Sequence, residues 1–147
     1  MVTQKLNETM NEDWPPASIA VVVFNSSKYI RDLLFSVLNT DYPNFEVILV
    51  NCKSTDDSVR IIMEFAGGSR VKTVDLDHDA RYDEANNIGA RLAKGEYLVL
   101  LNSDTIVQRD WLKELVIAME EDERIGLAQS FLREIDPPHS VQCDAAS

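Results

Sequence analysis

Basic residues are scarce in this 147-residue chain, which has 14 Lys and Arg against 25 Asp and Glu and a formal net charge of -11. Nucleic-acid binding draws most of its affinity from cationic side chains that neutralise phosphates, so the charge argues against a general nucleic-acid-binding protein. It does not exclude a single nucleotide, because carboxylates can hold a metal ion that neutralises one diphosphate locally.

Cysteine and membrane-directed segments are scarce as well. Cys52 and Cys143 are the only cysteines, and their separation argues against a zinc site or a disulfide scaffold and favours a reducing compartment. The first 18 residues contain no apolar run that follows a cationic segment, so no signal peptide or membrane anchor is predicted. We therefore expect a cytoplasmic protein, with peripheral association at the cytoplasmic membrane face left open.

Several catalytic motifs are missing. The chain has neither a Gly-rich dinucleotide loop nor a GxxxxGK[ST] loop, which argues against the commonest oxidoreductases and nucleotide triphosphatases. No Ser/His/Asp or Cys/His arrangement can be placed, so hydrolysis through a nucleophilic side chain is disfavoured. A receiver-like phosphoacceptor domain needs paired acids after its first strand, where this chain has Phe24 and Asn25.

What the chain does contain is a regular alternation of two apolar patterns. Continuous apolar runs predict strands that are covered on both faces, and amphipathic segments between them predict helices. The expected strands cover residues 19–24, 45–50, 71–76, 97–101 and 125–131, and the expected helices cover residues 30–38, 59–66, 83–93 and 110–119. This order predicts an α/β, Rossmann-like fold, with a mostly parallel sheet between helices and the first strand at its centre.

The two ends of the chain differ in composition from this alternating region. Residues 1–16 are polar and end in Pro15-Pro16, which predicts a flexible leader. We expect one domain over residues 17–136, since chains of this length usually form a single domain. Residues 137–147 are interpreted as a polar tail, truncated before a further, acceptor-binding half of a longer protein.

Polar residues follow three of the expected strands. They are Asn25-Ser26, Asn51-Cys52-Lys53-Ser54 and Asn102-Ser103-Asp104-Thr105. Each group alone is explained by the preference of Asn, Ser and Asp for turns and helix caps. Because ligands bind at the carboxyl ends of strands in such sheets, together they predict a site. The acidic segment Asp75, Asp77, Asp79 and Asp83 is more typical of a solvated loop than of a second metal site.

Four ordered motifs resemble the family-2 glycosyltransferases, whose fold is called GT-A. The motifs are IAVVVFN at residues 19–25, FEVILVNCKSTD at residues 45–56, ANNIG at residues 85–89 and GEYLVLLNSDT at residues 95–105. The resemblance extends over residues 18–134, and it rests on the order of the four motifs rather than on any one of them.

The resemblance implies roles for individual residues in binding a nucleoside diphosphate sugar. Phe24 and Asn25 are expected to contact the base and the ribose. Asn51 stands where the family commonly has an Asp that accepts a hydrogen bond from a pyrimidine ring, and Asn can still accept through its carbonyl oxygen. Asn87 and Gly89 match an Asn-x-Gly segment, in which Asn hydrogen-bonds the donor and Gly permits close helix packing.

The segment Asn102-Ser103-Asp104 aligns with the family's Asp-x-Asp motif, which binds Mg²⁺ or Mn²⁺ together with the donor diphosphate. Asp104 is expected to be the direct metal ligand and the catalytic residue. Asn102 is expected to be a neutral contact at the metal, and both Asn102 and Ser103 are expected to bind the nucleotide sugar. The Asn-x-Asp-Thr form resembles the rhamnosyltransferase-type members, which implies a dTDP- or UDP-linked sugar.

The implied reaction is an inverting transfer of sugar to a glycan or a lipid-linked acceptor, in which metal at Asp104 assists departure of the diphosphate. In the resembling family the base that deprotonates the acceptor lies beyond the Asp-x-Asp motif, and Glu134, Asp136 and Asp144 cannot be matched to it. The chain alone is therefore expected to be inactive in transfer. The alternative is a non-catalytic module that binds nucleotide sugar without turnover.

Overall fold

The structure is a computed structural model that describes residues 14–135 and 140–144. Its centre is a parallel sheet of four strands in the order β3-β2-β1-β4. The strands are β1 (Ala17–Val23), β2 (Phe45–Cys52), β3 (Val71–Leu76) and β4 (Tyr97–Asn102). The predicted parallel sheet is confirmed, and β1 lies between β2 and β4 as expected. Most of the expected leader, and Asp136, lie outside the described residues.

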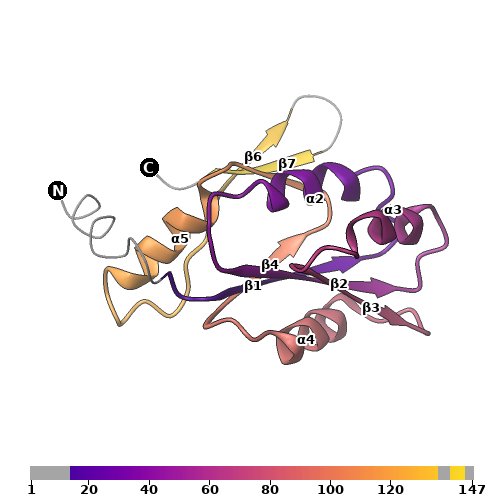
Figure 1. Cartoon of the computed structure of the whole chain (residues 1–147), viewed down its shortest axis with the longest axis horizontal. Helices are drawn as coiled ribbons and strands as arrows, with labels where there is room; N and C mark the ends of the chain where they lie inside the picture. Colours follow the sequence, from indigo (N-terminus) through magenta and orange to yellow (C-terminus); the bar gives the residue numbers. More distant parts are fainter. Residues whose placement is uncertain (1–13, 136–139, 145–147) are drawn as a thin grey trace.

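Four helices pack around this sheet, each close to its expected range. They are α2 (Ile30–Leu38), α3 (Ser58–Phe65), α4 (Tyr82–Leu92) and α5 (Trp111–Glu120). In Figure 1, α2 and α3 lie on one side of the sheet and α4 lies on the other. The crossovers between parallel strands therefore cover both faces of the sheet, as the continuous apolar runs predict.

Alternate residues of β1 divide the core into two layers. Ile19, Val21 and Val23 are fully buried in the cluster that includes the apolar stripes of α2, α3 and α5. Val22 belongs to a second cluster with Ile48 of β2 and residues of α4. Because successive strand residues point to opposite faces, a run of consecutive apolar residues is what a strand between two helix layers requires.

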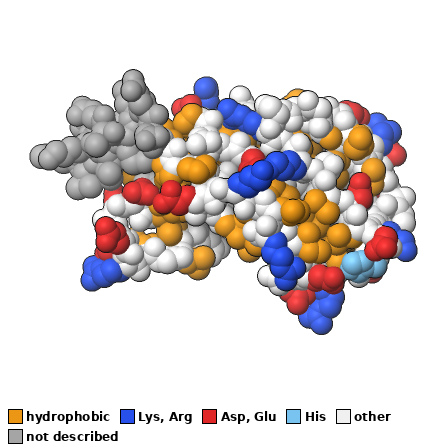
Figure 2. Space-filling view, turned by 60° about the horizontal axis from the view of Figure 1, so that its bottom comes forward, with side chains coloured by type: hydrophobic (Ala, Val, Ile, Leu, Met, Phe, Trp, Pro, Cys, Tyr) orange, Lys and Arg blue, Asp and Glu red, His pale blue; other side chains and the backbone are white. Residues whose placement is uncertain are grey.

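The sheet is less well covered at β4, one of its two edge strands in the part of the chain that the structure describes. Leu98 and Leu100 of β4 are exposed. The space-filling view shows hydrophobic side chains at the surface of the side that carries α4 (Figure 2). No helix within residues 14–135 or 140–144 is long and apolar enough to cross a membrane.

The chain after β4 departs from the sequence prediction. The strand expected over residues 125–131 is wrong: residues 126–130 have no regular secondary structure, and β6 (Phe131–Ile135) begins where that strand was expected to end. Leu127 is 85% exposed, so the apolar side chain gains no burial that would favour a strand there. A second sheet instead joins β6 to β5 (Thr105–Val107) and β7 (Ser140–Asp144), in the order β5-β7-β6. Strand β7 falls within the segment expected to be a polar tail.

A close backbone contact holds the start of β4 against β1. The N–H of Gly95 donates a hydrogen bond to the Ser18 hydroxyl oxygen at 2.8 Å. A Cβ atom at Gly95 would lie 2.6 Å from the carbonyl carbon of Ala17 and 2.6 Å from the nitrogen of Ser18. These are backbone atoms of a central strand, so they cannot move aside as a flexible side chain would.

We predict that Gly95→Ala destabilises the fold by about 1–3 kcal/mol, the usual effect of forcing an extra methyl group into a packed region. Gly126→Ala is the matched control, because nothing lies within 4 Å of the Cβ position at Gly126. Its free energy of unfolding should stay within about 0.5 kcal/mol of the parent. Urea denaturation of the three proteins measures the difference, and equal stabilities of the two variants would contradict the packing argument.

Candidate functional site

The carboxyl ends of β1 and β2 are joined by hydrogen bonds between their loops. Asn25 has a φ of 46°, a left-handed conformation that Asn tolerates better than most residues. Its backbone N–H donates to the Ser54 hydroxyl oxygen at 3.0 Å, and its Oδ1 accepts from the backbone N–H of Thr55 at 2.8 Å. Asn25 is exposed, so its amide nitrogen remains on the surface of the site.

The loop after β1 also holds the loop after β4. The hydroxyl groups of Ser26 and Ser103 lie 2.8 Å apart, within hydrogen-bonding distance. Ser26 is buried, and its backbone N–H donates to the Ser58 hydroxyl oxygen at 2.8 Å. This contact ties the Asn102-Ser103-Asp104 turn to the loop after the central strand, and it does so at Ser103, one residue before Asp104.

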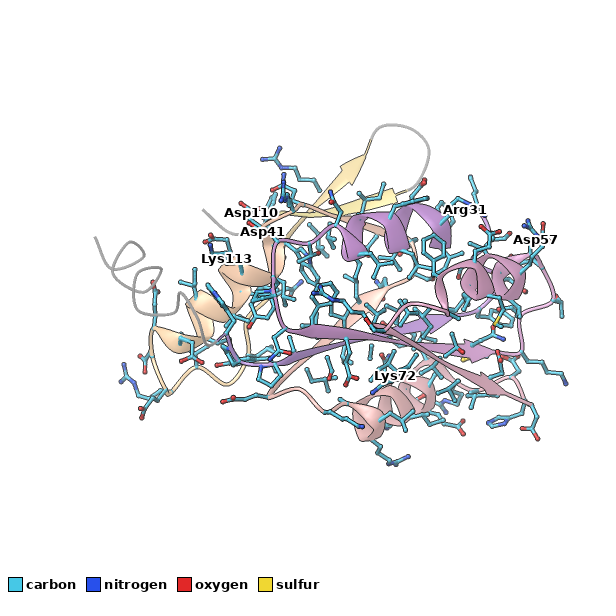
Figure 3. The ribbon with its side chains drawn as sticks, viewed as in Figure 1. Arg31, Asp41, Asp57, Lys72, Asp110 and Lys113 are labelled. Atoms are coloured by element: carbon cyan, nitrogen blue, oxygen red, sulfur yellow. The ribbon has the colours of Figure 1, made fainter. Side chains whose placement is uncertain are left out.

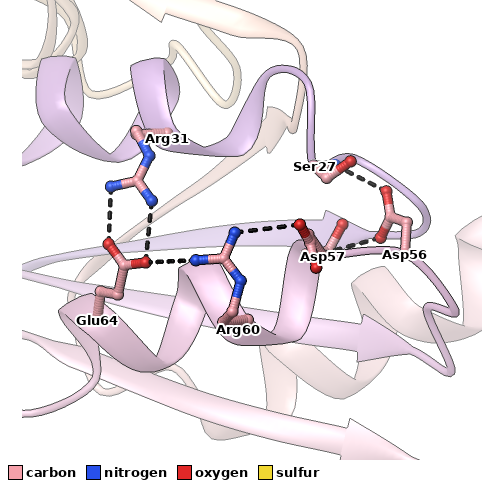
Figure 4. A network of polar contacts seen from close by, with 7 residues as sticks. Ser27, Arg31, Asp56, Asp57, Arg60 and Glu64 are labelled. Atoms are coloured by element: carbon pink, nitrogen blue, oxygen red, sulfur yellow. Dashed lines mark hydrogen bonds and ion pairs between the residues drawn. The ribbon is translucent and has the colours of Figure 1, made fainter.

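Asp56 provides the charged tie between β1 and the start of α3. Its carboxylate accepts the backbone N–H of Ser27 at 2.9 Å and that of Ser58 at 3.0 Å (Figure 4). Desolvation by burial raises the pKa of Asp56, but hydrogen bonds from Ser58 and Ser27 lower it more, so the net pKa lies well below the usual range of Asp. The carboxylate is therefore charged across the physiological pH range.

Beside this tie, an ion-pair network runs over the outer surface of α2 and α3. Glu64 accepts from Arg31 and from Arg60, and Arg60 also donates to Asp57 (Figure 4). All four side chains are substantially exposed, so solvent screens these pairs and each contributes little to stability. The network lies outside the group of strand-end residues that could face a ligand.

The polar residues before α2 do not cap that helix with their side chains. The N-cap position is Tyr29, which makes no side-chain cap hydrogen bond, and the backbone N–H groups of Tyr29 and Ile30 donate to the Ser26 carbonyl. The interpretation of Asn25 and Ser26 as side-chain caps of this helix is therefore wrong. Their side chains instead hold one loop against another.

At the end of β2, Asn51 is enclosed by the protein. Its side chain is 5% exposed, its Nδ2 donates to Oδ1 of Asp75 at 2.9 Å, and its Oδ1 accepts from the backbone N–H of Ser54 at 3.2 Å. Asn51 and Asp75 are direct partners in the pairing of β2 with β3. The expected base-binding residue therefore already has one internal partner on each polar atom of its amide.

At the end of β4, Asn102 and Asp104 have different surroundings. Oδ1 of Asn102 accepts a hydrogen bond from the Tyr82 hydroxyl at 2.6 Å. Asp104 is half-buried, and among the described residues no hydrogen bond or ion pair engages its carboxylate. Of the expected site residues it is the one that offers a free negative charge beside the joined loops.

Phe24 and Asn87 complete the set of expected residues. Phe24 is half-exposed directly after β1, where its ring is accessible to a ligand. Asn87 is exposed on α4, and its side chain makes no hydrogen bond to the strand-end loops within the described part of the chain. Gly89 is buried, and a Cβ there would lie 2.9 Å from Cβ of Ala20, which confirms its use in close helix packing.

Sequence reasoning missed the partners of these residues, namely Asp75 and Tyr82. Asp75 could have been found from the sequence, because aligning the ends of the second and third strands places it opposite Asn51. Tyr82 lies at the start of α4, twenty residues before Asn102, and no pattern in the sequence links the two.

The described side chains offer limited ligands for a metal ion. No group of three or more His, Cys, Asp or Glu residues among them is arranged to hold one. Magnesium is commonly bound by one or two carboxylates together with substrate phosphates, and Asp104 supplies one such carboxylate. The site therefore fits an ion that shares its coordination with a bound diphosphate, and it does not fit an ion held by protein ligands alone.

A groove of about 560 Å³ opens next to Asp104. It is lined by β4, by α5 and by the segment at residues 126–130, and Asn102, Asp104 and Thr105 line it as well. The groove therefore reaches the turn after β4, and the contact between Ser26 and Ser103 joins that turn to the loop after β1.

Comparison with known proteins agrees with this geometry. The family model described as glycosyl transferase family 2 matches residues 18–141. Glycosyltransferase GlyG of Streptococcus pneumoniae is 32% identical over 72% of this chain and 36% of its own length. A poly-beta-1,6-N-acetyl-D-glucosamine synthase of Staphylococcus epidermidis is 31% identical over 74% of this chain and 26% of its own length.

Solved structures show the same fold. TarS 1-349 of S. aureus, in complex with UDP-GlcNAc, has a TM-score of 0.66 and 26% identity over 81% of this chain and 38% of that one. The mannosyltransferase PcManGT of Pyrobaculum calidifontis, in complex with GDP-Man and Mn²⁺, has a TM-score of 0.76 and 22% identity, with coverages of 89% and 42%. The chain spans less than half the length of each of these relatives. These likenesses confirm the GT-A fold predicted from the four motifs.

The lowered pKa of Asp56 predicts a pH-dependent contribution to stability. Asp56→Asn should destabilise the protein by about 1–3 kcal/mol at pH 7, because an amide cannot accept from both backbone N–H groups through oxygen. The extra stability of the parent over the variant is fully present above the unfolded-state pKa of about 3.9. It should shrink as the pH falls below that value towards the lower folded-state pKa.

Urea denaturation of the parent and of Asp56→Asn at pH 7 and near pH 3 measures this difference. Asp57→Asn is the control, since its exposed carboxylate pairs only with Arg60 and contributes less than about 1 kcal/mol. A stability gap between parent and Asp56→Asn that is the same at both pH values would contradict the assigned ionisation.

Proposed function

The chain belongs to glycosyl transferase family 2, and from this membership we propose that it transfers sugar from a nucleoside diphosphate sugar to a glycan or lipid-linked acceptor. Residues 17–136 form the donor-binding domain in this proposal. The observation that carries it is the free Asp104 carboxylate, held beside strand-end loops that hydrogen bonds join into one surface. This is where ligands bind in open α/β sheets.

We assign the nucleoside to the loop after β1. The exposed ring of Phe24 offers a face for the base, and Asn25 offers an amide nitrogen to the ribose while Thr55 holds its oxygen. The solved relatives support a nucleotide sugar as donor, since they were solved in complex with UDP-GlcNAc and GDP-Man. For this chain we propose a UDP- or dTDP-linked sugar.

We assign the diphosphate and the sugar to the end of β4. Asp104 would hold Mg²⁺ or Mn²⁺ there, and such an ion neutralises the charge of the leaving diphosphate. Asn102, oriented by Tyr82, lies within the same surface and contributes a neutral contact. Ser103 fixes the turn through Ser26. Asn87, which is exposed on α4, would contact the donor from that helix.

The acceptor must approach the anomeric carbon from the side opposite the diphosphate for transfer with inversion. The groove beside β4 and α5 adjoins Asp104 and provides one wall for that approach. The matched region is less than half of each relative, and we place the rest of the acceptor site and the catalytic base outside residues 17–136. Transfer of sugar by the full-length protein, absent in the Asp104→Ala variant, would separate the enzyme from a non-catalytic binding module.

We predict that Mn²⁺ strengthens binding of UDP or dTDP through Asp104. Calorimetric titration of the parent with each nucleotide, with and without Mn²⁺, should show that Mn²⁺ increases nucleotide affinity about tenfold or more. Groups around a metal site commonly change metal affinity on this scale. Asp104→Ala should lose this increase and keep its fold, because the side chain makes no structural hydrogen bond among the described residues. Asn102→Ala should lose less.

Asp110→Ala is the matched control for removal of one carboxylate. Asp110 precedes α5 and lies beside Asp41 in Figure 3, and Asp41 is in the loop that leads into the amino end of β2. Asp110 is therefore at the edge of the sheet opposite the strand-end loops. Its removal should leave the metal-dependent increase unchanged. Equal enhancement by Mn²⁺ in the parent and in Asp104→Ala would contradict the assignment of the metal to Asp104.

A further inference from the structure

We propose that Asp75, rather than Asn51, supplies the carboxylate that recognises the imino N–H of a uracil or thymine base, with Asn51 as the residue that positions it. This inference rests on the proposed function and specifies how its donor is selected. Both residues lie at the carboxyl edge of the sheet, where they are direct partners in the pairing of β2 with β3.

Burial separates the roles of the two side chains. Asn51 is 5% exposed, and its carbonyl oxygen accepts from the backbone N–H of Ser54. That oxygen is the only atom of the side chain that could accept from a base, and it is turned towards the protein backbone. A nucleotide bound at this edge of the sheet can therefore contact only the small exposed part of Asn51.

Asp75 has the complementary arrangement. Its side chain is exposed, and its Oδ1 accepts from Nδ2 of Asn51 at 2.9 Å. Within the part of the chain that the structure describes, no hydrogen bond engages its Oδ2. One oxygen thus holds the carboxylate in a fixed orientation, and the other is free to accept a proton donor from a ligand.

The free oxygen of Asp75 can distinguish uracil and thymine from cytosine. Uracil and thymine present an N–H donor at N3, which matches a carboxylate oxygen. Cytosine presents an unprotonated nitrogen at the same position, so its lone pair would face the negative charge. A site built to accept a hydrogen bond rejects a ligand that lacks the donor, because its polar group is left without a partner.

Charge repulsion and a specific hydrogen bond predict opposite effects of removing the charge of Asp75. A nucleoside diphosphate is an anion, so a nearby carboxylate repels it through the general field. If Asp75 acted only through that field, Asp75→Asn would tighten nucleotide binding. If Asp75 accepts the imino N–H, the same substitution weakens binding of UDP, in the opposite direction.

The experiment is calorimetric titration of the parent and Asp75→Asn with UDP, CDP and N3-methyl-UDP in the presence of Mn²⁺. The parent should bind UDP about tenfold or more tightly than N3-methyl-UDP or CDP, the scale of one hydrogen bond to a charged group. Asp75→Asn should reduce UDP affinity to near that of N3-methyl-UDP and leave N3-methyl-UDP binding almost unchanged. The introduced amide oxygen can still accept from Asn51, so the fold should be retained, as thermal unfolding will show.

Two further variants separate a specific contact from a general effect. Asp79→Asn removes one negative charge from the same exposed segment and should leave the ratio of UDP to N3-methyl-UDP affinity unchanged. Asn51→Ala leaves Asp75 without its holding partner and should reduce the same ratio, by less than Asp75→Asn does.

The outcomes distinguish this inference from the proposed function. UDP binding by Asp75→Asn that equals or exceeds that of the parent would overturn the inference and leave the proposed function standing. An equal loss for UDP and N3-methyl-UDP would assign Asp75 a structural role and also overturn it. If the parent binds no nucleoside diphosphate, the proposed donor site is wrong and the inference falls with it.

Discussion

Parallel pairing of β1 with both β2 and β4 is the constraint on which the rest of the structure depends. It aligns Val23 of β1 with Asn51 of β2, and Val22 of β1 with Asn102 of β4. The first polar residue after the apolar run of each neighbouring strand therefore lies beside the end of the central strand. The pairing is itself maintained by helices on both faces, since a parallel sheet is stable only when both faces are covered. The site is a consequence of how the core is built.

Once the strand ends are brought together, short polar side chains hold the loops in place. Ser26 reaches Ser103, Asn25 reaches Thr55, and Asp56 reaches the backbone of the β1 loop. Each of these bonds joins residues far apart in the sequence, so it fixes one loop relative to another as well as satisfying a polar group. Loops fixed in advance lose less conformational entropy when a ligand binds, which favours affinity.

Replacement of family carboxylates by amides changes the electrostatics of this edge. Asn at positions 51 and 102 lowers the negative charge that an incoming diphosphate must meet, in a chain whose net charge is already -11. The remaining carboxylates differ in what they contact. Asp56 is engaged by the protein backbone, whereas Asp104 and Asp75 each keep an oxygen without a partner among the described residues. Asn102 in turn takes its orientation from Tyr82.

The sequence by itself determined the four strands of the parallel sheet among the five it predicted, the four described helices and the meeting of polar loops at the carboxyl edge, because burial periodicity and parallel topology are readable from local patterns. It failed at residues 125–131, where apolar composition resembled a strand although Leu127 is exposed. Only the tertiary structure decided which polar atoms are engaged and which are free. Those pairings, such as Asn51 with Asp75, depend on strand register and side-chain burial, which join distant residues and leave no periodic signal in the chain.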